Sequence, residues 1–547
     1  MYYTDRHFKM MHNSKYGLPL RVTSVWLLVI YCLALPTASD CRQNATNPPN
    51  IIFILADDYG FHDIGYHDSK IKTPWLDKLA GEGVKLENYY VQPICTPTRS
   101  QLMSGRYQIH TGLEHWIIWV VQPSCLPVKD KTVADKLKEL GYATHAIGKW
   151  HLGFYKKACW PTRRGFDTFF GYYTGSEEYF SHLRGCGMPG FSCKGFTTGL
   201  DFRDQEEPVY NYSGRYSTHL FAERAQQILE DHDRQKPFFL YLPFQAVHSP
   251  LQVPEKYIEP YLNVTDKNRR VYSGMVSCMD EAVGNITQTV SKLGLWDNTV
   301  LIFSTDNGGQ IYYGGSNWPL RGWKGSLWEG GVHGVGFVHS PLLAKSMQGT
   351  SSKAMIHVSD WFPTLVAGIA GGSLAGLELD GHDVWQTISQ GKDSPRTEIL
   401  HNIDPIPYPG APHVAGPEHQ TAAHTDHYYS FYGNQSGSFN TTIRAAIRAG
   451  DWKLITGFPG NGSWIPPPDS GISPIHPNEP KGKHVWLFNI QQDPNEHNDL
   501  SDAHPDIVKQ LVDKLQVYYS TLVPPFFPPG DPRANPALHG GIWTNWE

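Results

Sequence analysis

The sequence predicts an α/β protein in which helices cover both faces of a large, mostly parallel sheet, followed by a smaller α+β domain. Two patterns predict the large sheet. Helical patterns alternate with short strands, and these strands are continuous apolar runs, as is typical of strands buried on both faces. After about residue 395 the alternation ends, and proline, glycine, histidine and asparagine dominate 403–440. We therefore expect a large domain at 48–395 and a smaller one, with a proline-rich tail, at 396–547.

The expected elements follow in order along the chain. The buried strands are expected at 51–55, 142–147, 238–242 and 300–304. The helices between them are expected at about 133–140, 221–229 and 272–293. Thr132 is placed to cap the first of these helices and Gly141 to end it. In the smaller domain, strand-like segments lie at 442–457 and 484–490, and a last helix is expected at about 505–522.

The N-terminal segment has the order of a secretory signal. Basic residues precede an apolar run from Val25 to Leu35, and Pro-Thr-Ala-Ser follows. This predicts a signal peptide at 1–39 that is cleaved near Ser39; a retained signal anchor is the alternative. The run is shorter than the roughly 20 apolar residues that a membrane span needs, and no later stretch approaches that length. We therefore expect a protein of the secretory pathway with no stable membrane span.

Sequons and charge support the same class. Seven Asn-x-Ser/Thr sequons lie at Asn44, Asn211, Asn263, Asn285, Asn434, Asn440 and Asn461. Behind a signal peptide they predict a luminal or secreted glycoprotein. The formal net charge is −6 and there is no stripe of basic residues, which argues against nucleic acid as a partner.

The cysteine count leaves a thiol without an internal partner. Eight cysteines become seven if Cys32 is removed with the signal peptide, and an odd number cannot pair completely. The expected disulfides are Cys186–Cys193, which closes a small loop, and Cys125–Cys159, which brackets a helix–strand unit. Cys41, Cys95 and Cys278 remain, and Cys278 lies in an apolar-periodic helix, where we expect a buried thiol.

Polar residues follow each of the four buried strands. The segments are ADDYG (56–60), GKWHLG (148–153), AVHSP (246–250) and DNGG (306–309). In open α/β sheets, ligands bind just beyond the carboxyl ends of the strands. We therefore expect all four segments to deliver side chains to one site at one edge of the sheet.

Oxygen-bearing side chains at this edge suit a hard divalent cation. Asp57 and Asp58 follow the first strand, and Asp306 and Asn307 follow the fourth. Carboxylate and amide oxygens without obligatory sulfur or imidazole favour Ca²⁺ or Mg²⁺ over zinc. Each pair alone is as well explained by a turn or a helix cap. Both pairs at one edge favour a metal site.

Basic side chains are expected at the same edge. Lys149 and His151 are two residues apart, so in an extended backbone both would face one cavity. A solvated lysine beside a packed histidine is the alternative. His248, before Ser-Pro, and Lys324, in the glycine- and tryptophan-rich segment 314–331, are each unremarkable alone.

Cys95 is predicted to begin a helix. Cys95 and Arg99 are four residues apart and would lie on one helical face, and Pro97 suits the first helical turn. The N-terminus of a helix attracts anions. With an arginine, two lysines and a cation nearby, the site is suited to a compact oxyanion, such as a phosphate or a sulfate ester.

These motifs carry a family resemblance. CTPTR (95–99), followed by SQLMSGR, resembles the sulfatase signature Cys-x-Pro-x-Arg, and GYATHAIGKWH (141–151) resembles the second sulfatase signature. The similarity extends over nearly the whole mature chain. It is closest to the animal arylsulfatase B (N-acetylgalactosamine-4-sulfatase) group, which includes arylsulfatases I and J. Stretches such as PTRRGFDTFFGY (161–172) and QAVHSPLQVPEKY (245–257) carry that closer match.

The resemblance implies a fold, a modification and a metal. The fold is alkaline-phosphatase-like, with a large mixed sheet between helices in the sulfatase catalytic domain (48–395) and an antiparallel sheet in the small C-terminal domain. Cys95 would be oxidised to formylglycine, an aldehyde, by the formylglycine-generating enzyme during secretion. One Ca²⁺ per chain would be held by Asp57, Asp58, Cys95, Asp306 and Asn307.

The resemblance also assigns roles to the basic residues. Arg99 would hold the hydrated aldehyde, and Lys149 and Lys324 would bind the sulfate. His248 would contact the substrate and protonate the leaving oxygen. His151 would act as the base that removes the proton of the second hydroxyl, so that sulfate leaves.

The chain departs from the family pattern in four places. Ser104 stands where threonine is usual, and His333 where arginine often follows Glu-Gly-Gly. IIWVVQPSC (117–125) and DPRANP (531–536) each lack a cysteine that arylsulfatase B has. The loss of both looks like the loss of one disulfide, and in this respect the chain resembles arylsulfatases I and J.

Several hypotheses follow for substrate and location. The leading one is removal of 4-sulfate from N-acetylgalactosamine of chondroitin or dermatan sulfate. The alternatives are another sulfated glycosaminoglycan or aryl sulfate, a phosphatase or phosphodiesterase of the same superfamily, and a non-catalytic secreted glycoprotein that binds sulfated glycans. The lysosome is the expected location, with secretion as the alternative.

Overall fold

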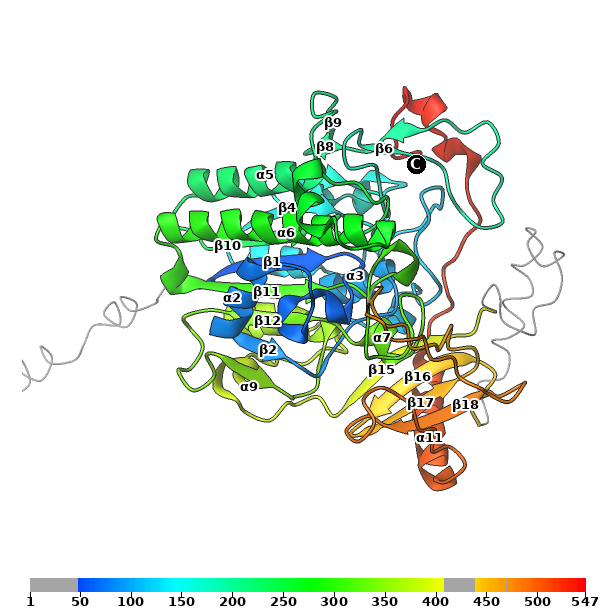
Figure 1. Ribbon diagram of the computed structural model, residues 1–547. Coiled ribbons are helices and arrows are strands. Elements are labelled where there is room, and N and C mark those ends of the chain that lie inside the picture. The colour runs from blue at the N-terminus through cyan, green and yellow to red at the C-terminus, as the bar shows by residue number, and fades with distance from the viewer. Residues whose placement is uncertain (1–47, 408–437, 469) are drawn as a thin grey trace, which may run out of the picture. The chain divides into compact units, whose positions relative to one another are not determined.

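The computed structural model describes residues 48–407, 438–468 and 470–547, which from Pro48 onward pack as one compact unit (Figure 1). The predicted signal peptide, Cys41, Asn44 and Asn434 lie outside the described residues. The predicted domain boundary at 395/396 stays a prediction.

The larger of the two main sheets has ten strands. Their bounds are β1 (Asn50–Ala56), β2 (Val84–Leu86), β4 (Ala143–Lys149), β5 (Thr168–Tyr172), β8 (Arg203–Asp204), β9 (Glu207–Pro208), β10 (Phe238–Pro243), β11 (Thr299–Thr305), β12 (Gly336–His339) and β13 (Thr350–Ser352). The spatial order is β13-β2-β12-β11-β1-β10-β4-β5-β8-β9. The central strands β11, β1, β10, β4 and β5 are parallel, whereas β12 and β8 run antiparallel to their neighbours. The prediction of a mixed, mostly parallel sheet is confirmed.

The four predicted strands form the centre of this sheet. They correspond to β1, β4, β10 and β11, and every residue of β1, β10 and β11 is buried. Full burial on both faces explains why these strands are continuous apolar runs rather than alternating ones.

Helices cover both faces of the sheet, because alternate side chains of β1 point to opposite sides. Ile52 and Ile54 pack against α2 (Pro74–Glu82), α5 (Ser217–Asp231) and α6 (Lys267–Lys292). Ile51, Phe53 and Leu55 pack against α3 (Cys95–Ser104), α4 (Val133–Glu139) and α8 (Trp361–Pro363). In Figure 1, α5 and α6 run side by side along one face. As predicted, Thr132 caps α4, where it forms a capping box with Asp135.

Short elements complete the large part. They are β3 (Tyr89–Tyr90), β6 (Leu183–Arg184), β7 (Gly199–Leu200), β14 (Ile356–His357), α7 (Glu329–Val332) and α9 (Trp385–Gln390). β14 pairs with β3, and β6 with β7.

A second sheet follows in the C-terminal part. It has the antiparallel order β15 (Glu398–Asp404), β16 (Arg444–Ala449), β17 (Trp452–Thr456) and β18 (Val485–Asn489). The last helix, α11 (Pro505–Thr521), packs on this sheet through Leu511 and Leu515 (Figure 1). The predicted antiparallel sheet and last helix are confirmed, and β15 is a strand that the sequence patterns did not indicate.

The proline-rich tail returns to the large part of the molecule. Val523 N–H donates to Ile109 O (2.9 Å), and Trp543, which is fully buried, donates its N–H to Leu200 O (3.0 Å). Asp531 N–H donates to Val121 O at 2.8 Å. The two segments in which a cysteine is missing therefore lie side by side, joined by a backbone hydrogen bond.

The cysteines within the described residues pair as expected. The disulfides Cys125–Cys159 and Cys186–Cys193 are present, and Cys95 and Cys278 are buried free thiols. The described sequon asparagines are exposed, at Asn211, Asn263, Asn285, Asn440 and Asn461. Their glycosylation stays a prediction. Within 48–407, 438–468 and 470–547, no helix has the length and apolar character that crossing a membrane requires.

Candidate active site

The polar segments after β1, β4, β10 and β11 meet at the carboxyl edge of the large sheet. Backbone hydrogen bonds tie three of them together: Asp57 N–H donates to Ala246 O (3.0 Å), and Asp306 N–H to Ala56 O (3.0 Å). Asp58 N–H donates to the Asp306 carboxylate at 3.2 Å. This edge holds the predicted site residues in one place.

Cys95 lies at the start of α3, against the carboxylates. Its Sγ is 3.8 Å from Asp57 Oδ1. One ligand atom from each of Asp57, Asp58, Cys95 and His248 lies within 4.8 Å of the others, a grouping that could hold a metal ion. His248, predicted as a proton donor, therefore lies in this group as well.

Asn307 tests whether the site fits a cation. Its Nδ2 donates to Asp58 Oδ1 at 2.8 Å, which leaves the amide oxygen facing away from that bond. Oδ1 is buried and has no hydrogen-bond partner among the described residues. A buried acceptor without a partner is costly, so it calls for an explanation. An oxygen-rich donor set with one unused amide oxygen fits a divalent cation such as Ca²⁺.

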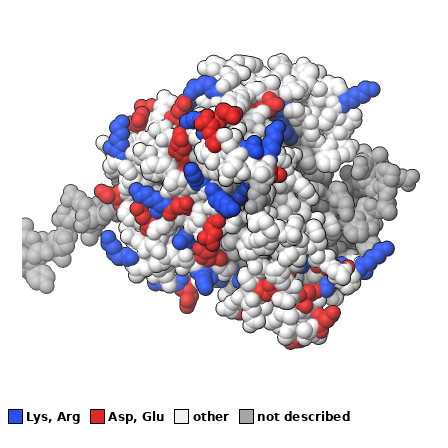
Figure 2. Space-filling view, in the orientation of Figure 1, with Lys and Arg blue, Asp and Glu red and all other residues white. Residues whose placement is uncertain are grey.

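Two buried cations and one partly buried cation balance three buried carboxylates. Lys149 Nζ lies 2.5 Å from Asp57, and Lys324 Nζ lies 2.5 Å from Asp58. Arg99 donates from Nη2 to Asp306 at 2.8 Å and lies 3.3 Å from Asp57. Apart from the partly buried Lys324, these side chains are buried, unlike the basic and acidic side chains scattered over the face shown in Figure 2.

The pKa values separate the site's titratable groups. Burial raises the pKa of Asp58, but Lys324 and His248 outweigh it and lower the value to about 2. Burial, with the charge of Asp57, raises the pKa of Asp306 to about 6. Burial raises the pKa of the Cys95 thiol to about 12 and, with Lys324, lowers that of His248 to about 3. Asp58 therefore stays ionised at neutral and mildly acidic pH.

His151 is placed differently from the prediction. β4 ends at Lys149, and His151 has a φ of 54°, so the extended backbone that was assumed does not continue through His151. The His151 ring still reaches the site. Burial, and then the neighbouring charges of Lys149 and Arg99, hold the pKa of the His151 ring well below its usual value. Its Nε2 lies 3.1 Å from Ile118 O, whereas Nδ1 is buried and makes no hydrogen bond to any described residue.

Backbone strain marks the same edge. Asp58 (φ 55°) and His151 (φ 54°) lie in the left-handed region, which non-glycine residues rarely adopt and which is often found at functional sites. Gly148, which precedes Lys149, has φ 126°, and a Cβ there would lie 2.0 Å from Pro243 O. Only glycine therefore lets β4 approach β10 closely enough to place Lys149.

Two supporting residues were missed by the sequence reasoning. Thr96 Oγ1 donates to His151 O at 3.3 Å, and Thr98 Oγ1 donates to Asp306 O at 2.5 Å. Both lie inside CTPTR, so their spacing from Cys95 could have indicated them. Among the departures, Ser104 Oγ donates to Ser100 O (2.6 Å), and the His333 ring stacks on Tyr90 at 5.0 Å.

The fold and the site define a class of protein. The edge of this alkaline-phosphatase-like sheet brings together a helix N-terminus, three cationic side chains and an oxygen-rich cluster. Such a site is suited to a hydrolase that acts on esters of compact oxyanions.

The comparisons identify the family. A sulfatase family profile matches residues 49–371, and the chain belongs to the sulfatase family, which hydrolyses sulfate esters. Mouse arylsulfatase J is 51% identical over 510 residues, covering 92% of this chain and 81% of the relative. Human N-acetylgalactosamine-6-sulfatase is 26% identical, with coverages of 92% and 90%. The crystal structure of Ps i-CgsB in complex with k-i-k-neocarrahexaose superposes with a TM-score of 0.70 at 26% identity, covering 90% of this chain and 98% of that one.

Proposed function

We propose that the protein hydrolyses sulfate esters through a formylglycine made from Cys95, and that its substrate is the 4-sulfate of N-acetylgalactosamine at the ends of chondroitin or dermatan sulfate. One observation carries the mechanism. Cys95 is an unpaired thiol at the N-terminus of α3, with its Sγ 3.8 Å from Asp57 in a cluster of cation ligands. The secretory pathway follows from the predicted signal peptide, with the lysosome as the proposed destination and secretion as the alternative.

The modification is a two-electron oxidation at Cys95 Cβ. The Cβ–S bond and one Cβ–H bond are replaced by a C=O bond, water supplies the oxygen, and sulfur leaves as hydrogen sulfide. Two electrons and two protons pass to the oxidant that the formylglycine-generating enzyme uses during secretion. When present, the hydrated aldehyde supplies one hydroxyl that can attack sulfur and a second that allows sulfate to leave again.

The cation would be Ca²⁺, one per chain. Asp57, Asp58, Asp306, Asn307 and the modified residue 95 would hold it, and the unused Asn307 Oδ1 supports this assignment. When bound, Ca²⁺ supplies positive charge that favours the ionised form of a nearby hydroxyl and the developing charge on the sulfate.

The remaining residues bind the sulfate and move protons. Lys149 and Lys324 would turn from Asp57 and Asp58 toward the sulfate oxygens and hold them as paired cations. Arg99, fixed by Asp306, would orient residue 95. His248 would donate a proton to the leaving sugar oxygen, and His151 would accept the proton that frees the sulfate, each within the range typical of general acid–base catalysis, roughly 10²–10⁴-fold.

A different sulfated substrate is the second candidate. Asp531 N–H donates to Val121 O, and these residues lie in the two segments that each lack a cysteine of arylsulfatase B. The chain shares 51% identity with arylsulfatase J, so the substrate of this protein and that of arylsulfatase B need not be the same.

Mass spectrometry of the tryptic peptide that contains residue 95 tests the modification. Protein from a competent secretory cell should show an aldehyde mass. Finding only the thiol would overturn the formylglycine mechanism. Cys95→Ala should abolish sulfate release while the protein is still secreted, and Cys278→Ala, which removes the other buried free thiol, is the matched control.

Defined oligosaccharides test the substrate. N-acetylgalactosamine ends with sulfate at position 4 should release sulfate, and those with sulfate at position 6 should not. Release from the 6-sulfated compound alone, or from neither, would contradict the proposed substrate while leaving the mechanism to be judged by an aryl sulfate.

A further inference from the structure

A fifth parallel strand brings a further segment to the edge that holds the candidate active site. β5 runs parallel to β4, so its carboxyl end lies at the same edge as the ends of the four predicted strands. The segment 173–183 follows β5. Within it, Gly175 lies against the ring of His151, and Tyr179 contacts the backbone of His248. One segment therefore reaches both histidines to which the proposed function assigns proton transfer.

Tyr179 holds the backbone turn that carries His248. Tyr179 is fully buried, and its hydroxyl lies 2.8 Å from His248 O and 3.1 Å from Gln245 O. His248 N–H donates to the same Gln245 oxygen at 3.0 Å, so the hydroxyl lies across the turn 245–248. A carbonyl oxygen only accepts, so the Tyr179 hydroxyl is the donor here, and a phenylalanine would leave both carbonyls without it.

The direction of the His248 ring follows from this turn. Nδ1 lies 2.6 Å from the carbonyl oxygen of the next residue, Ser249, and therefore carries the hydrogen of that bond. Nε2 points to the site, 3.7 Å from Asp58 Oδ2. Because the ring is bonded to the backbone beside it, a shift of the turn would move Nε2 away from its place.

Tyr179 is itself fixed by its surroundings. Its N–H donates to Gln252 Oε1 at 2.8 Å, and its ring stacks on Tyr216 with 5.1 Å between the ring centres. The Tyr216 hydroxyl donates to Gln252 O at 2.9 Å. The segments 173–183 and 244–252 are thus joined on both sides of the Tyr179 ring, so its hydroxyl has one defined position.

Gly175 leaves the space that the His151 ring occupies. A Cβ at Gly175 would lie 2.7 Å from Cε1 and 2.8 Å from Nε2 of His151, which is closer than side-chain atoms approach one another. His151 Nε2 also lies 3.1 Å from Ile118 O. An alanine at position 175 would therefore push the ring away from this carbonyl.

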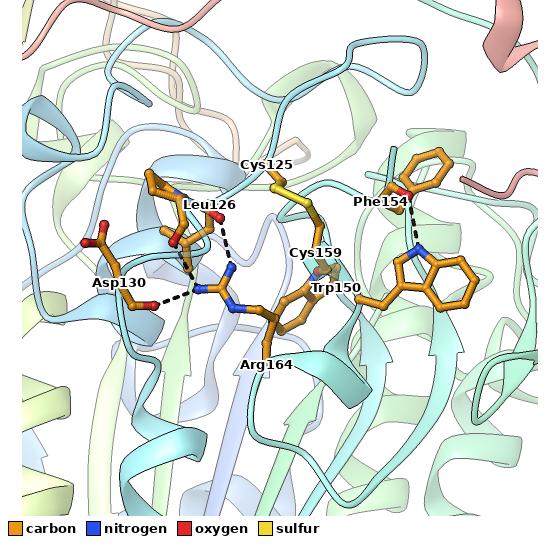
Figure 3. Close-up of a disulfide and its surroundings, with 9 residues drawn as sticks. Cys125, Leu126, Asp130, Trp150, Phe154, Cys159 and Arg164 are labelled. Atoms are coloured by element: carbon orange, nitrogen blue, oxygen red, sulfur yellow. Dashed lines mark hydrogen bonds between the residues drawn. A yellow bond between two sulfur atoms is a disulfide. The ribbon is translucent and has the colours of Figure 1, made fainter. Parts of the chain in front are cut away.

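The backbone around His151 cannot easily give way instead. The N–H groups of Trp150 and His151 donate to the carbonyl oxygens of 172 and 173, at 3.0 and 3.1 Å. The Trp150 indole donates to Cys159 O at 3.0 Å, beside the Cys125–Cys159 disulfide shown in Figure 3. With its backbone held on both sides, the ring of His151 has to absorb any added volume at Gly175.

We propose that Tyr179 and Gly175 are positioning residues for the two histidines: the Tyr179 hydroxyl aims His248 at the leaving oxygen, and Gly175 keeps the His151 ring in place. The inference rests on the proposed function, because that function gives the histidines their roles. It assigns the alignment of both proton transfers to the one segment that follows β5.

Kinetics of Tyr179→Phe on two substrates test the first half. A sugar oxygen must be protonated as it leaves, whereas p-nitrophenolate is a weak base that leaves without a proton. On a 4-sulfated N-acetylgalactosamine oligosaccharide we expect kcat to fall by about tenfold, part of the roughly 10²–10⁴-fold that general acid catalysis contributes. On p-nitrophenyl sulfate kcat should change by less than about twofold. Tyr142→Phe is the matched control, because it also removes a buried hydroxyl that donates to a backbone carbonyl, that of Pro49, at the start of β4.

A double variant separates positioning from general stability. If Tyr179 acts through His248, then Tyr179→Phe should cost nothing further on the oligosaccharide once His248→Ala has removed the ring. Losses that multiply in the double variant, or an equal loss on both substrates in Tyr179→Phe alone, would overturn this half of the proposal.

Gly175→Ala tests the second half. His151 acts after the leaving group has departed, so kcat should fall on both substrates by a similar factor, about tenfold. The p-nitrophenol of the first turnover should then be released faster than that of later turnovers, because release of sulfate limits the rate. Gly185→Ala, at an exposed glycine with open space around its Cβ position, is the matched control. A Gly175→Ala protein that fails to fold, or that shows no fast first turnover, would overturn this half.

Crystal structures of both variants in the Cys95→Ala background give a readout that needs no activity. Tyr179→Phe should move the His248 ring and leave His151 in place, and Gly175→Ala should do the reverse. Unmoved rings would overturn the proposal. A wild type that releases sulfate from neither substrate would contradict the proposed function instead, and the two crystal structures would still decide whether the histidines are positioned in this way.

Discussion

The candidate active site and the contact between the two sheets both bury several charged side chains, but they satisfy those charges differently. At the active site, the buried Asn307 Oδ1 has no hydrogen-bond partner among the described residues. The second group, which we call the junction cluster, consists of Tyr90, Glu329, Arg448, Lys453 and Glu496, all of them buried. Its members come from β3, α7, β16, β17 and the segment after β18.

In the junction cluster, the charged side chains pair with one another. Lys453 Nζ lies 2.7 Å from Glu329 Oε1 and 2.9 Å from Glu496 Oε1. The other Glu329 oxygen accepts from Tyr90 OH at 2.7 Å, and Glu329 N–H donates to Glu496 at 2.7 Å. Arg448 donates to the Tyr90 hydroxyl. Groups that hold one another in this way lock the small sheet onto the large part, whereas the lysines of the active site can exchange their carboxylates for a substrate.

Lys453→Met tests the structural half of this comparison and has the largest expected effect. Removing the lysine leaves Glu329 and Glu496 buried and facing each other without a cation, so the free energy of unfolding should fall by about 3–5 kcal/mol. Denaturant unfolding followed by tryptophan fluorescence measures the change. Lys509→Met, which breaks an exposed pair with Asp513, should change the free energy by about 0–1 kcal/mol. Equal effects of the two variants would contradict the structural role.

Lys324→Ala tests the functional half. Lys324 is 12% exposed and contacts Asp58, and as a proposed sulfate ligand its removal should lower kcat by roughly 10²–10³-fold, or about 2.7–4 kcal/mol in transition-state stabilisation. Its unfolding midpoint should move less than that of Lys453→Met, because Asp58 keeps the hydrogen bond from Asn307. If Lys324→Ala is fully active, or unfolds as readily as Lys453→Met, then Lys324 has a structural role rather than a role in sulfate binding.

The sequence could predict the active site because its residues follow strand ends. Asp57 and Asp306 come directly after buried apolar strands, and His248 follows five residues after the end of β10. Parallel strands bring their carboxyl ends to one edge whatever the details of packing. The position of Cys95 at a helix start could also be predicted, since Pro97 and the four-residue spacing to Arg99 are local signals.

The junction cluster could not be predicted, because no local sequence pattern links its members. Lys453 and Glu329 are 124 residues apart, and Lys453 stands in a strand whose other residues are mostly apolar. Gly175 and Tyr179 lie in a loop, where side-chain direction depends on backbone angles that spacing does not give. The same limit explains His151, whose left-handed backbone replaced the extended one that was assumed.

Removal of the cation should distinguish the active site from the junction cluster further. If Ca²⁺ binds only the folded protein, a concentration about 100 times Kd stabilises it by about 2.7 kcal/mol, and a chelator should remove that amount together with the activity. The loss should be the same in Lys453→Met, because no hydrogen bond or ion pair joins the described side chains of the two sites, and it should be absent in Asp58→Asn. A chelator effect that survives Asp58→Asn would mean that the cation binds elsewhere.

The pH dependence of stability gives the smallest and most specific difference. Burial raises the pKa of Glu496 to about 7, with Glu329 adding to the effect and Lys453 opposing it. The folded protein therefore binds this proton more tightly than the unfolded chain does, so the stabilisation is complete at acidic pH and is lost as pH rises through about 7. Burial would also raise the pKa of Glu329, but Lys453 and His333 lower it well below its usual value, so Glu329 stays ionised throughout this window.

Glu496→Gln should remove this dependence. Between about pH 5 and 8 the wild type should lose stability relative to Glu496→Gln, because only the wild type must give up the buried proton or bury a second negative charge beside Glu329. Unfolding midpoints of the two proteins at pH 5, 6, 7 and 8 measure the difference, and Glu255→Gln, at an exposed glutamate, is the control. Parallel curves for the wild type and Glu496→Gln would mean that Lys453 neutralises both carboxylates over the whole range. The junction cluster would then be insensitive to pH over this range.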